Sequence, residues 1–180
     1  MKKAFVLTLM VVFCSAAGFG SVSFELQGSY FSPTDSNFKS IYGGGWEYGG
    51  VISFHLTTSL DLWLDGGYFA KSGSLTFTQE ETKLTLIPLG AGLRYRILPG
   101  RITPYVDAGA RYIIYRETNV IGEVSAGGIG FVGKAGLAIG LSDHFGLDVH
   151  AAYSYCSMKP ADFEFNVGGL EFGAGLVFSF

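Results

Sequence analysis

An apolar side chain occupies every second position in the segment GGLEFGAGLVFSF, residues 168 to 180. These positions are Leu170, Phe172, Ala174, Leu176, Phe178 and Phe180. Successive side chains of a β-strand point to opposite faces, so a two-residue period places all of these side chains on the same face. The pattern predicts a strand with one continuous apolar face.

Seven further segments of the chain show the same alternation of apolar and polar residues. Segments of about ten residues with this period, separated by turn residues, are typical of the strands of outer-membrane barrels. The complete set of predicted strands spans residues 23–31, 45–56, 59–70, 84–97, 103–115, 129–141, 145–155 and 168–180.

The connections between these segments alternate between long and short. The long ones cover residues 32–44, 71–82, 116–128 and 156–167, and the short ones cover 57–58, 98–100 and 142–144. Outer-membrane barrels have tight periplasmic turns and longer extracellular loops. We therefore predict an all-β fold, a transmembrane up-and-down antiparallel eight-stranded β-barrel, with its first strand starting from the periplasm. Pro88 and Pro104 lack a backbone donor and are expected at strand ends or bulges.

The composition indicates a protein that meets a surface other than water. Of the 180 residues, 48% are hydrophobic, and the mean hydropathy is +0.34. A transmembrane helix needs about 20 consecutive apolar residues, and the only long apolar run, Ala4 to Cys14, is much shorter. The chain therefore has no predicted helical span.

A soluble β-sandwich or lipocalin-like barrel is the alternative, and it would turn the apolar face inward. Two features favour the membrane barrel. The polar face is rich in glycine, alanine and charges of both signs, which suits a narrow interior. The aromatic residues of the apolar face gather at two levels, as in the girdles of a bilayer protein. The periplasmic level contains Phe24, Phe54, Tyr95, Phe145, Phe178 and Phe180, and the extracellular level contains Tyr30, Trp46, Tyr48, Tyr68, Tyr112, Phe131, Tyr153 and Tyr155.

Residues 1–20 have the features of a cleaved signal peptide, and residues 21–180 form the predicted barrel domain. Lys2 and Lys3 precede the apolar run, and small residues follow it, with cleavage expected between Ala17 and Gly20. Without the two lysines, ten basic residues face fifteen acidic ones, a formal charge of −5. Nucleic acid is a poor partner for that charge. Cys156 is then the only cysteine, which excludes an internal disulfide.

The polar face of the predicted strands supplies charges of both signs to the lumen. The interior of an eight-stranded barrel is just wide enough for side chains to fill, and buried charges need partners. We predict a polar network that fills the lumen, made of Glu25, Glu47, Asp61, Asp65, Arg94, Arg96, Asp107, Arg111, Lys134, Asp148 and Glu171.

The chain resembles the superfamily of eight-stranded outer-membrane β-barrels. The resemblance rests on IPLGAGLRYRI (87–97), TPYVDAGARY (103–112), LSDHFGLDVHAAYSY (141–155) and the terminal GLVFSF. This superfamily includes the outer-membrane protein X and A barrels, the opacity-type adhesins and the outer-membrane protein W family. The resemblance implies a place in the outer membrane of a Gram-negative bacterium. It also implies an assembly signal at Leu176, Phe178 and Phe180, read by the barrel-assembly machinery.

The expected role is structural, or a surface interaction like that of an adhesin, through the extracellular loops of a monomer. The expected surroundings are outer-membrane lipid and lipopolysaccharide, whose phosphates could meet Arg116 and Lys159, and no loop carries a motif that names a partner. A narrow channel for small hydrophobic molecules is the alternative, followed by a lipopolysaccharide-modifying enzyme.

Catalysis, a metal site and a cofactor are not expected from the sequence. A serine nucleophile needs a histidine base within reach, whereas His150 and Ser154 lie about 13 Å apart along one strand face. The three scattered histidines have no ligand spacing.

Overall fold

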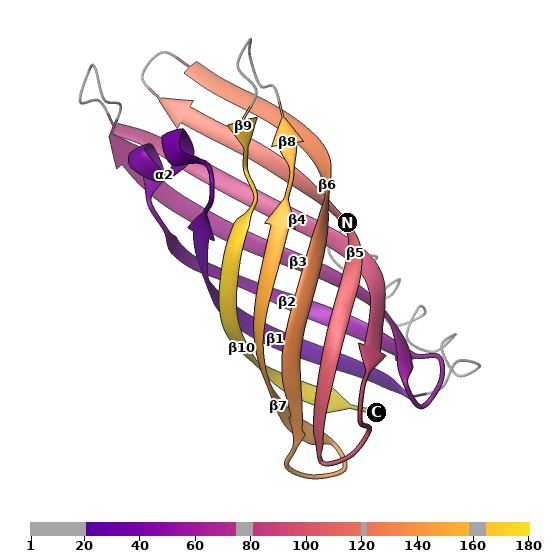
Figure 1. Ribbon diagram of the computed structural model, residues 1–180. Coiled ribbons are helices and arrows are strands. Elements are labelled where there is room, and N and C mark those ends of the chain that lie inside the picture. The colour runs from indigo at the N-terminus through magenta and orange to yellow at the C-terminus, as the bar shows by residue number, and fades with distance from the viewer. Residues whose placement is uncertain (1–20, 75–80, 120–121, 159–164) are drawn as a thin grey trace, which may run out of the picture.

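The computed structural model describes residues 21–74, 81–119, 122–158 and 165–180. The predicted signal peptide and Lys159 lie outside these residues. Strands pair side by side into a closed eight-stranded barrel in the order β1-β10-β7-β6-β5-β4-β3-β2 (Figure 1). Their bounds are β1 Val22–Pro33, β2 Gly45–His55, β3 Leu60–Ser74, β4 Glu81–Arg96, β5 Ile102–Asn119, β6 Gly122–Gly140, β7 Phe145–Tyr155 and β10 Gly169–Ser179. This arrangement confirms the predicted fold class.

All neighbouring strands of the barrel are antiparallel, and the barrel closes between β1 and β10. That pairing runs from Ser23 opposite Ser179 to Pro33 opposite Gly169. Short turns join β2 to β3, β4 to β5 and β6 to β7 at one end of the barrel. We call this the turn end, and we call the opposite end the helix end.

The prediction for Pro88 is wrong, because this residue lies inside β4 and the register does not shift there. Gly66 pairs with Leu89 and Phe69 pairs with Leu86, whereas the positions between them in β3 and β4 are unpaired. Proline has no N–H to donate, so the ladder to β3 is interrupted rather than bulged. Pro104 lies near the start of β5, opposite Leu137.

The strands extend into two of the predicted long connections. The β3–β4 ladder continues to Ser74 opposite Glu81, and the β5–β6 ladder continues to Asn119 opposite Gly122. The expectation of loops is therefore wrong for residues 71–74 and 81–82 of the first range and for 116–119 and 122–128 of the second, while 75–80 and 120–121 lie outside the described residues. Alternation of apolar and polar residues ends where a strand leaves the bilayer, whereas backbone hydrogen bonding continues without it.

The other two long connections contain short elements. Helix α2, Ser36–Tyr42, begins at Asp35, whose Oδ1 accepts from the backbone N–H groups of Asn37 and Phe38 at 3.0 and 3.1 Å. It ends at Gly43, whose φ of 63° suits a residue without a side chain. Strands β8, Ser157–Met158, and β9, Phe165–Asn166, form a small separate sheet. Within the described residues, no helix has the length and apolar character to cross a membrane.

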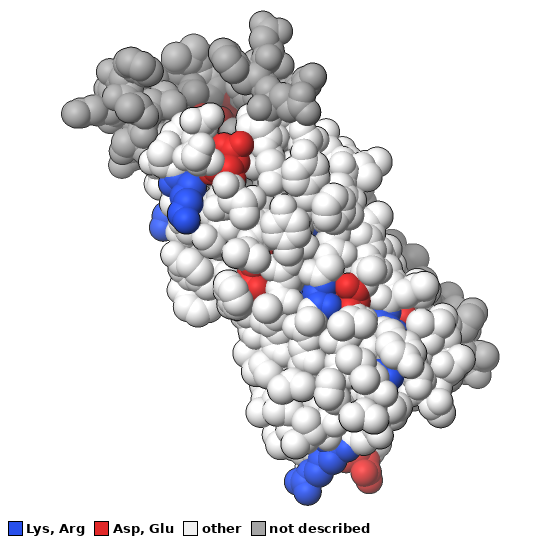
Figure 2. All heavy atoms as spheres, viewed as in Figure 1, with Lys and Arg blue, Asp and Glu red and all other residues white. Residues whose placement is uncertain are grey.

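The outer face of the barrel is apolar. Large apolar side chains that are 37 to 76% exposed include Leu26, Leu64, Leu93, Val106, Leu137 and Leu176. Figure 2 shows a wall that is mostly free of charged side chains, with acidic and basic atoms near the two ends and a few visible midway along the barrel. A surface of this kind suits hydrocarbon rather than water.

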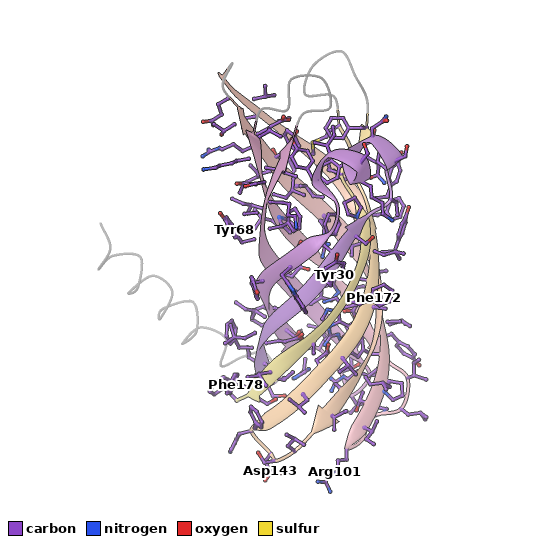
Figure 3. All side chains as sticks on the ribbon, turned by 90° about the vertical axis from the view of Figure 1, so that its left-hand side faces the viewer. Tyr30, Tyr68, Arg101, Asp143, Phe172 and Phe178 are labelled. Carbon is purple, nitrogen blue, oxygen red and sulfur yellow. The ribbon has the colours of Figure 1, made fainter. Side chains whose placement is uncertain are left out.

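Aromatic side chains lie at two levels on this outer face. Tyr30 packs edge-on against Trp46 at a centroid distance of 5.9 Å, and Phe145 contacts Phe178 at 5.5 Å. In Figure 3, Tyr30, Tyr68 and Phe172 lie toward the helix end relative to Phe178, and Arg101 and Asp143 lie at the tip of the turn end. Helix α2 and the ends of the long hairpins lie beyond Tyr68 (Figure 3).

Glycines on the inner face make room for large inward side chains. A Cβ added at Gly92 or Gly109 would lie 2.6 Å from Cζ2 of Trp63, and one added at Gly136 would lie 2.6 Å from the Tyr105 ring. Both distances are too short for real atoms. The narrow lumen therefore explains why the polar face is rich in glycine: each large inward side chain needs neighbouring residues that have no side chain.

Candidate functional site

The lumen holds the buried charges of the barrel. Nine of the eleven residues predicted to form the lumen network are 1 to 7% exposed: Glu25, Glu47, Asp61, Arg94, Asp107, Arg111, Lys134, Asp148 and Glu171. The side chains of Asp65 and Arg96 are 4% and 22% exposed. Because a buried charge is costly without a partner, the contacts among these residues define what the lumen can do.

At the turn end, Asp61 accepts hydrogen bonds from two side chains. Its Oδ1 lies 2.6 Å from Nη2 of Arg96 and 2.7 Å from Nδ1 of His55. Nη2 of Arg96 also donates to the carbonyl oxygen of Thr57 at 3.1 Å. This group ties the β2–β3 turn to the end of β4.

A cavity of about 190 Å³ opens at the turn end beside this group. Asp61, Arg96, Ser23, Arg94 and Tyr105 contribute to its wall. The cavity therefore reaches from the turns into the lumen as far as Tyr105.

Arg94 makes a bidentate ion pair next to this cavity. Its Nε and Nη2 donate to the two carboxylate oxygens of Asp107 at 2.9 and 3.0 Å, between directly opposed positions of β4 and β5. The guanidinium carbon lies 3.8 Å from the centroid of the Tyr105 ring. Paired donors and a stacked ring hold Arg94 in one orientation. The hydroxyl of Tyr105 in turn donates to Oδ1 of Asp148 at 3.0 Å.

Asp148, His150 and Ser29 form a chain of contacts deeper in the lumen. Nδ1 of His150 lies 2.7 Å from Oδ1 of Asp148, and Nε2 lies 3.2 Å from Oγ of Ser29. An ionised carboxylate only accepts hydrogen bonds, so Nδ1 carries the proton. Serine, imidazole and carboxylate in this order have the connectivity of a hydrolase triad.

The serine of this arrangement does not face the turn-end cavity. Ser29 is 3% exposed and does not line the turn-end cavity. Sequence reasoning considered His150 with Ser154 and missed Ser29, because β1 and β7 are far apart in the chain and meet only across β10. Ser154 instead donates to Oε1 of Glu171 at 3.3 Å.

Arg111 is the cation of a second buried group, closer to the helix end. Its Nη2 donates to Oδ2 of Asp65 at 3.0 Å, and its Nη1 donates to Oε1 of Glu171 at 2.5 Å. Glu47 lines the same small space as Arg111 and Glu171. Three carboxylates thus surround one guanidinium, each from a different strand.

Apolar side chains close the lumen at the helix end. We call this cluster the apolar plug, and its members are at most 5% exposed: Phe31, Phe38, Tyr42, Phe69, Leu84, Leu86, Ile113, Tyr115, Cys156, Met158 and Val167. The rings of Phe31 and Phe69 pack edge to face at 5.3 Å. Sequence reasoning missed the plug, although Leu84 and Leu86 give a signal, since that segment is apolar on both faces.

Helix α2 is attached to the plug by Tyr42. The Tyr42 hydroxyl lies 3.4 Å from Oγ1 of Thr82, which donates to Oε1 of Glu117 at 2.9 Å. Tyr115 donates to the other oxygen of the same carboxylate. Burial raises the pKa of Tyr42 to about 12, so its hydroxyl keeps its proton at neutral pH.

The residues of the predicted assembly signal lie on the outward face of β10. Leu176 is 43% exposed and Phe180 is 75% exposed. Phe178 packs against Phe145 of the neighbouring β7. These side chains therefore form part of the apolar wall at the turn end.

A closed barrel with an apolar outer wall, two aromatic levels and a filled polar lumen is a transmembrane β-barrel of the outer-membrane type. The family described as outer membrane protein beta-barrel domain matches residues 5–180, and the chain belongs to that family. Its location is the bacterial outer membrane. Barrels of this class place short turns in the periplasm and longer connections outside, so the turn end is periplasmic and the helix end is extracellular.

Solved structures of outer-membrane proteins share this fold. OprG of Pseudomonas aeruginosa matches with a TM-score of 0.67 and 14% identity, over 90% of this chain and 96% of OprG. The N-terminal β-barrel domain of OprF from the same organism matches with a TM-score of 0.59 and 20% identity, over 90% of this chain and 98% of the OprF domain. Neisserial surface protein A matches with a TM-score of 0.60 and 18% identity, over 89% of this chain and 99% of that protein. No curated protein matches the chain.

Proposed function

We propose that the protein is a closed outer-membrane barrel with a structural or surface-interaction role, exerted through its extracellular end, and without catalytic activity. The closed lumen is the observation that carries this proposal. The apolar plug fills the extracellular end, and ion pairs with the buried Trp63, Val51, Val132 and Ala152 fill the section below it. A solute has to displace several packed layers to pass.

The extracellular end offers a firm surface for contacts. The β5–β6 hairpin keeps its backbone pairing to Asn119 opposite Gly122, and Arg116 and Glu123 form an exposed ion pair at 3.0 Å on it. Among the structural matches, the attachment invasion locus protein of Yersinia pestis is an attachment protein by name, with a TM-score of 0.52 and 17% identity. That name supports a surface role, and lipopolysaccharide is the expected neighbour of this rim.

Conductance across a planar bilayer tests the closed lumen. Purified, refolded protein is expected to insert without producing reproducible single-channel steps. A variant in which residues 36–42 are replaced by a Gly-Ser linker should stay silent as well, because the Arg111 group and Trp63 close the lumen below the plug. Reproducible steps from the unchanged protein would favour the alternative, a narrow channel for small hydrophobic molecules.

Adhesion of whole cells tests the surface role. Cells that produce the protein should adhere to host cells or matrix proteins better than cells with a variant in which residues 116–125 are replaced by a short turn. Equal amounts of heat-modifiable barrel in both strains provide the control. Equal adhesion would contradict the role of this hairpin. Unchanged lipid A mass spectra on deletion of the gene are expected, and a changed spectrum would indicate an enzyme.

A further inference from the structure

We propose that Glu25, Asp148 and His150 form a binding site for a divalent transition-metal ion of the zinc class inside the lumen. One carboxylate oxygen of each acid and one imidazole nitrogen lie within 4.8 Å of one another, and all three residues are buried. The sequence predicts no metal site, since its three histidines have no ligand spacing, and the ligands proposed here come from two strands that are distant in the chain. This site is independent of the proposed surface role.

Two carboxylate oxygens at this place lack hydrogen-bond partners. Within the described residues, Oε1 of Glu25 and Oδ2 of Asp148 are buried without any partner, and the two residues are 4% and 1% exposed. A buried carboxylate oxygen without a donor is costly. A cation between the two carboxylates removes this cost.

The nearest cationic side chains are directed at other partners. Arg94 uses Nε and Nη2 on Asp107, and Nζ of Lys134 lies 3.5 Å from Oε1 of Gln27. Neither makes a hydrogen bond with Glu25 or Asp148 within the described part of the chain. The carboxylates therefore keep their capacity to bind an ion.

Strand β10 allows the three ligands to meet. Glu25 comes from β1, whereas Asp148 and His150 come from β7, and β10 lies between these strands. β10 places Gly173 and Gly175 at its inward positions there. A Cβ at Gly175 would lie 2.6 Å from Oε1 of Glu25, and one at Gly173 would lie 2.7 Å from Nε2 of His150. The ligand side chains thus occupy space that the side chain of any residue other than glycine at positions 173 and 175 would fill.

The donor set favours zinc over calcium or magnesium. Imidazole with carboxylates is a usual ligand set for Zn²⁺, and three protein ligands leave one position open. Ca²⁺ and Mg²⁺ require six or more ligands, almost all of them oxygen. The turn-end cavity leads toward the site from the periplasm, since Tyr105 lines this cavity and its hydroxyl contacts Asp148.

Zinc binding by the refolded full chain in detergent tests this site. Isothermal titration with Zn²⁺ alone is expected to show one ion per chain, with no comparable binding of Ca²⁺. Glu25→Gln and His150→Gln should each weaken binding about tenfold or more. Lys134→Met should strengthen it, because a nearby positive charge is removed.

His55→Gln is the matched control. The His55–Asp61 pair has the same 2.7 Å contact as the His150–Asp148 pair, but Arg96 occupies its carboxylate at 2.6 Å. His55→Gln and His144→Gln should leave zinc binding unchanged. Binding that is lost in these controls, or that is equal in the unchanged chain and in Glu25→Gln, would overturn the proposal.

A second measurement covers variants that fail to fold. Folded protein is recognised by its altered gel mobility before boiling. With Co²⁺ in place of Zn²⁺, the unchanged folded chain should show visible absorption bands of an ion with an imidazole ligand, which Zn²⁺ removes by competition. No such bands from folded protein would overturn the proposal without any variant.

Discussion

Arg111 shows how a single residue can control the stability of a barrel lumen. It pairs with Asp65 and Glu171, and its side chain is 3% exposed. Without it, the carboxylates that surround it would remain buried with no adjacent cation. Removing one partner of a buried ion pair costs far more folding free energy than removing one partner of an exposed pair, because solvent cannot replace the missing partner.

Arg111→Met is therefore expected to lower the free energy of unfolding by about 3–5 kcal/mol. Urea unfolding in detergent or lipid vesicles, followed by gel mobility without boiling, measures the change. Arg116→Met is the control, because the side chains of Arg116 and Glu123 are 60% and 52% exposed, and such pairs contribute about 0–1 kcal/mol. Equal effects of the two substitutions would contradict this assignment.

Cys156 is a residue whose chemistry is suppressed by packing. It follows β7 at the extracellular end, is fully buried in the apolar plug, and burial raises the pKa of its thiol. In folded protein, Cys156 should react with a maleimide on the order of hundredfold more slowly than after unfolding. Ser142→Cys in a Cys156→Ala background, at an exposed turn, should react at once. Rapid labelling of folded Cys156 would show that the plug opens.

The direction of most lumen side chains follows from the two-residue period, but their partners do not. Asp61, Asp107 and Glu171 alternate with apolar neighbours, and the structure places all of them in the lumen. Ser29 and His150 are 121 positions apart, and their contact depends on the register of both strands with β10. No local pattern encodes that register.

At the scale of elements, the sequence indicates the strands well only where they cross the bilayer. The apolar face is required there, so the alternation predicts a strand over 145–155, and these are the bounds of β7. Beyond the bilayer, β5 and β6 continue without an alternating apolar face. Helix α2 has a capping signal at Asp35 and apolar residues four apart at Phe38 and Tyr42. Its seven residues make only about two turns, so the helical period repeats too few times to be recognised in the sequence.

Strand β10 carries the predicted assembly signal, and its test is a deletion. Removing Phe180 should reduce the amount of assembled barrel in the outer membrane more than it reduces export, with unfolded chain accumulating in the periplasm. Fractionation and heat-dependent gel mobility measure both quantities. Phe172→Leu, on the same outward face but farther from the turn end, is the control. Normal assembly after deletion of Phe180 would refute the signal.

At the scale of the whole molecule, the seam between β1 and β10 closes the barrel. Ser23 and Ser179 are directly opposite, at a distance that a disulfide can span. With Cys156→Ala, the pair Ser23→Cys and Ser179→Cys should form a disulfide on oxidation, and the linked chain should migrate faster than the reduced one after boiling. Ser23→Cys with Ser154→Cys should not link. Failure of the first pair to link would contradict the closed order of strands.

The same seam has a consequence for the life of the chain before it reaches the membrane. Ribosomes make β1 first and β10 last of the barrel strands, so one edge of β1 has no partner until β10 has been synthesised. A chain interrupted before β10 therefore has two unpaired edges, which hydrocarbon does not tolerate. Completion of translation is thus a condition for entry into the bilayer, because a chain without β10 cannot close the barrel.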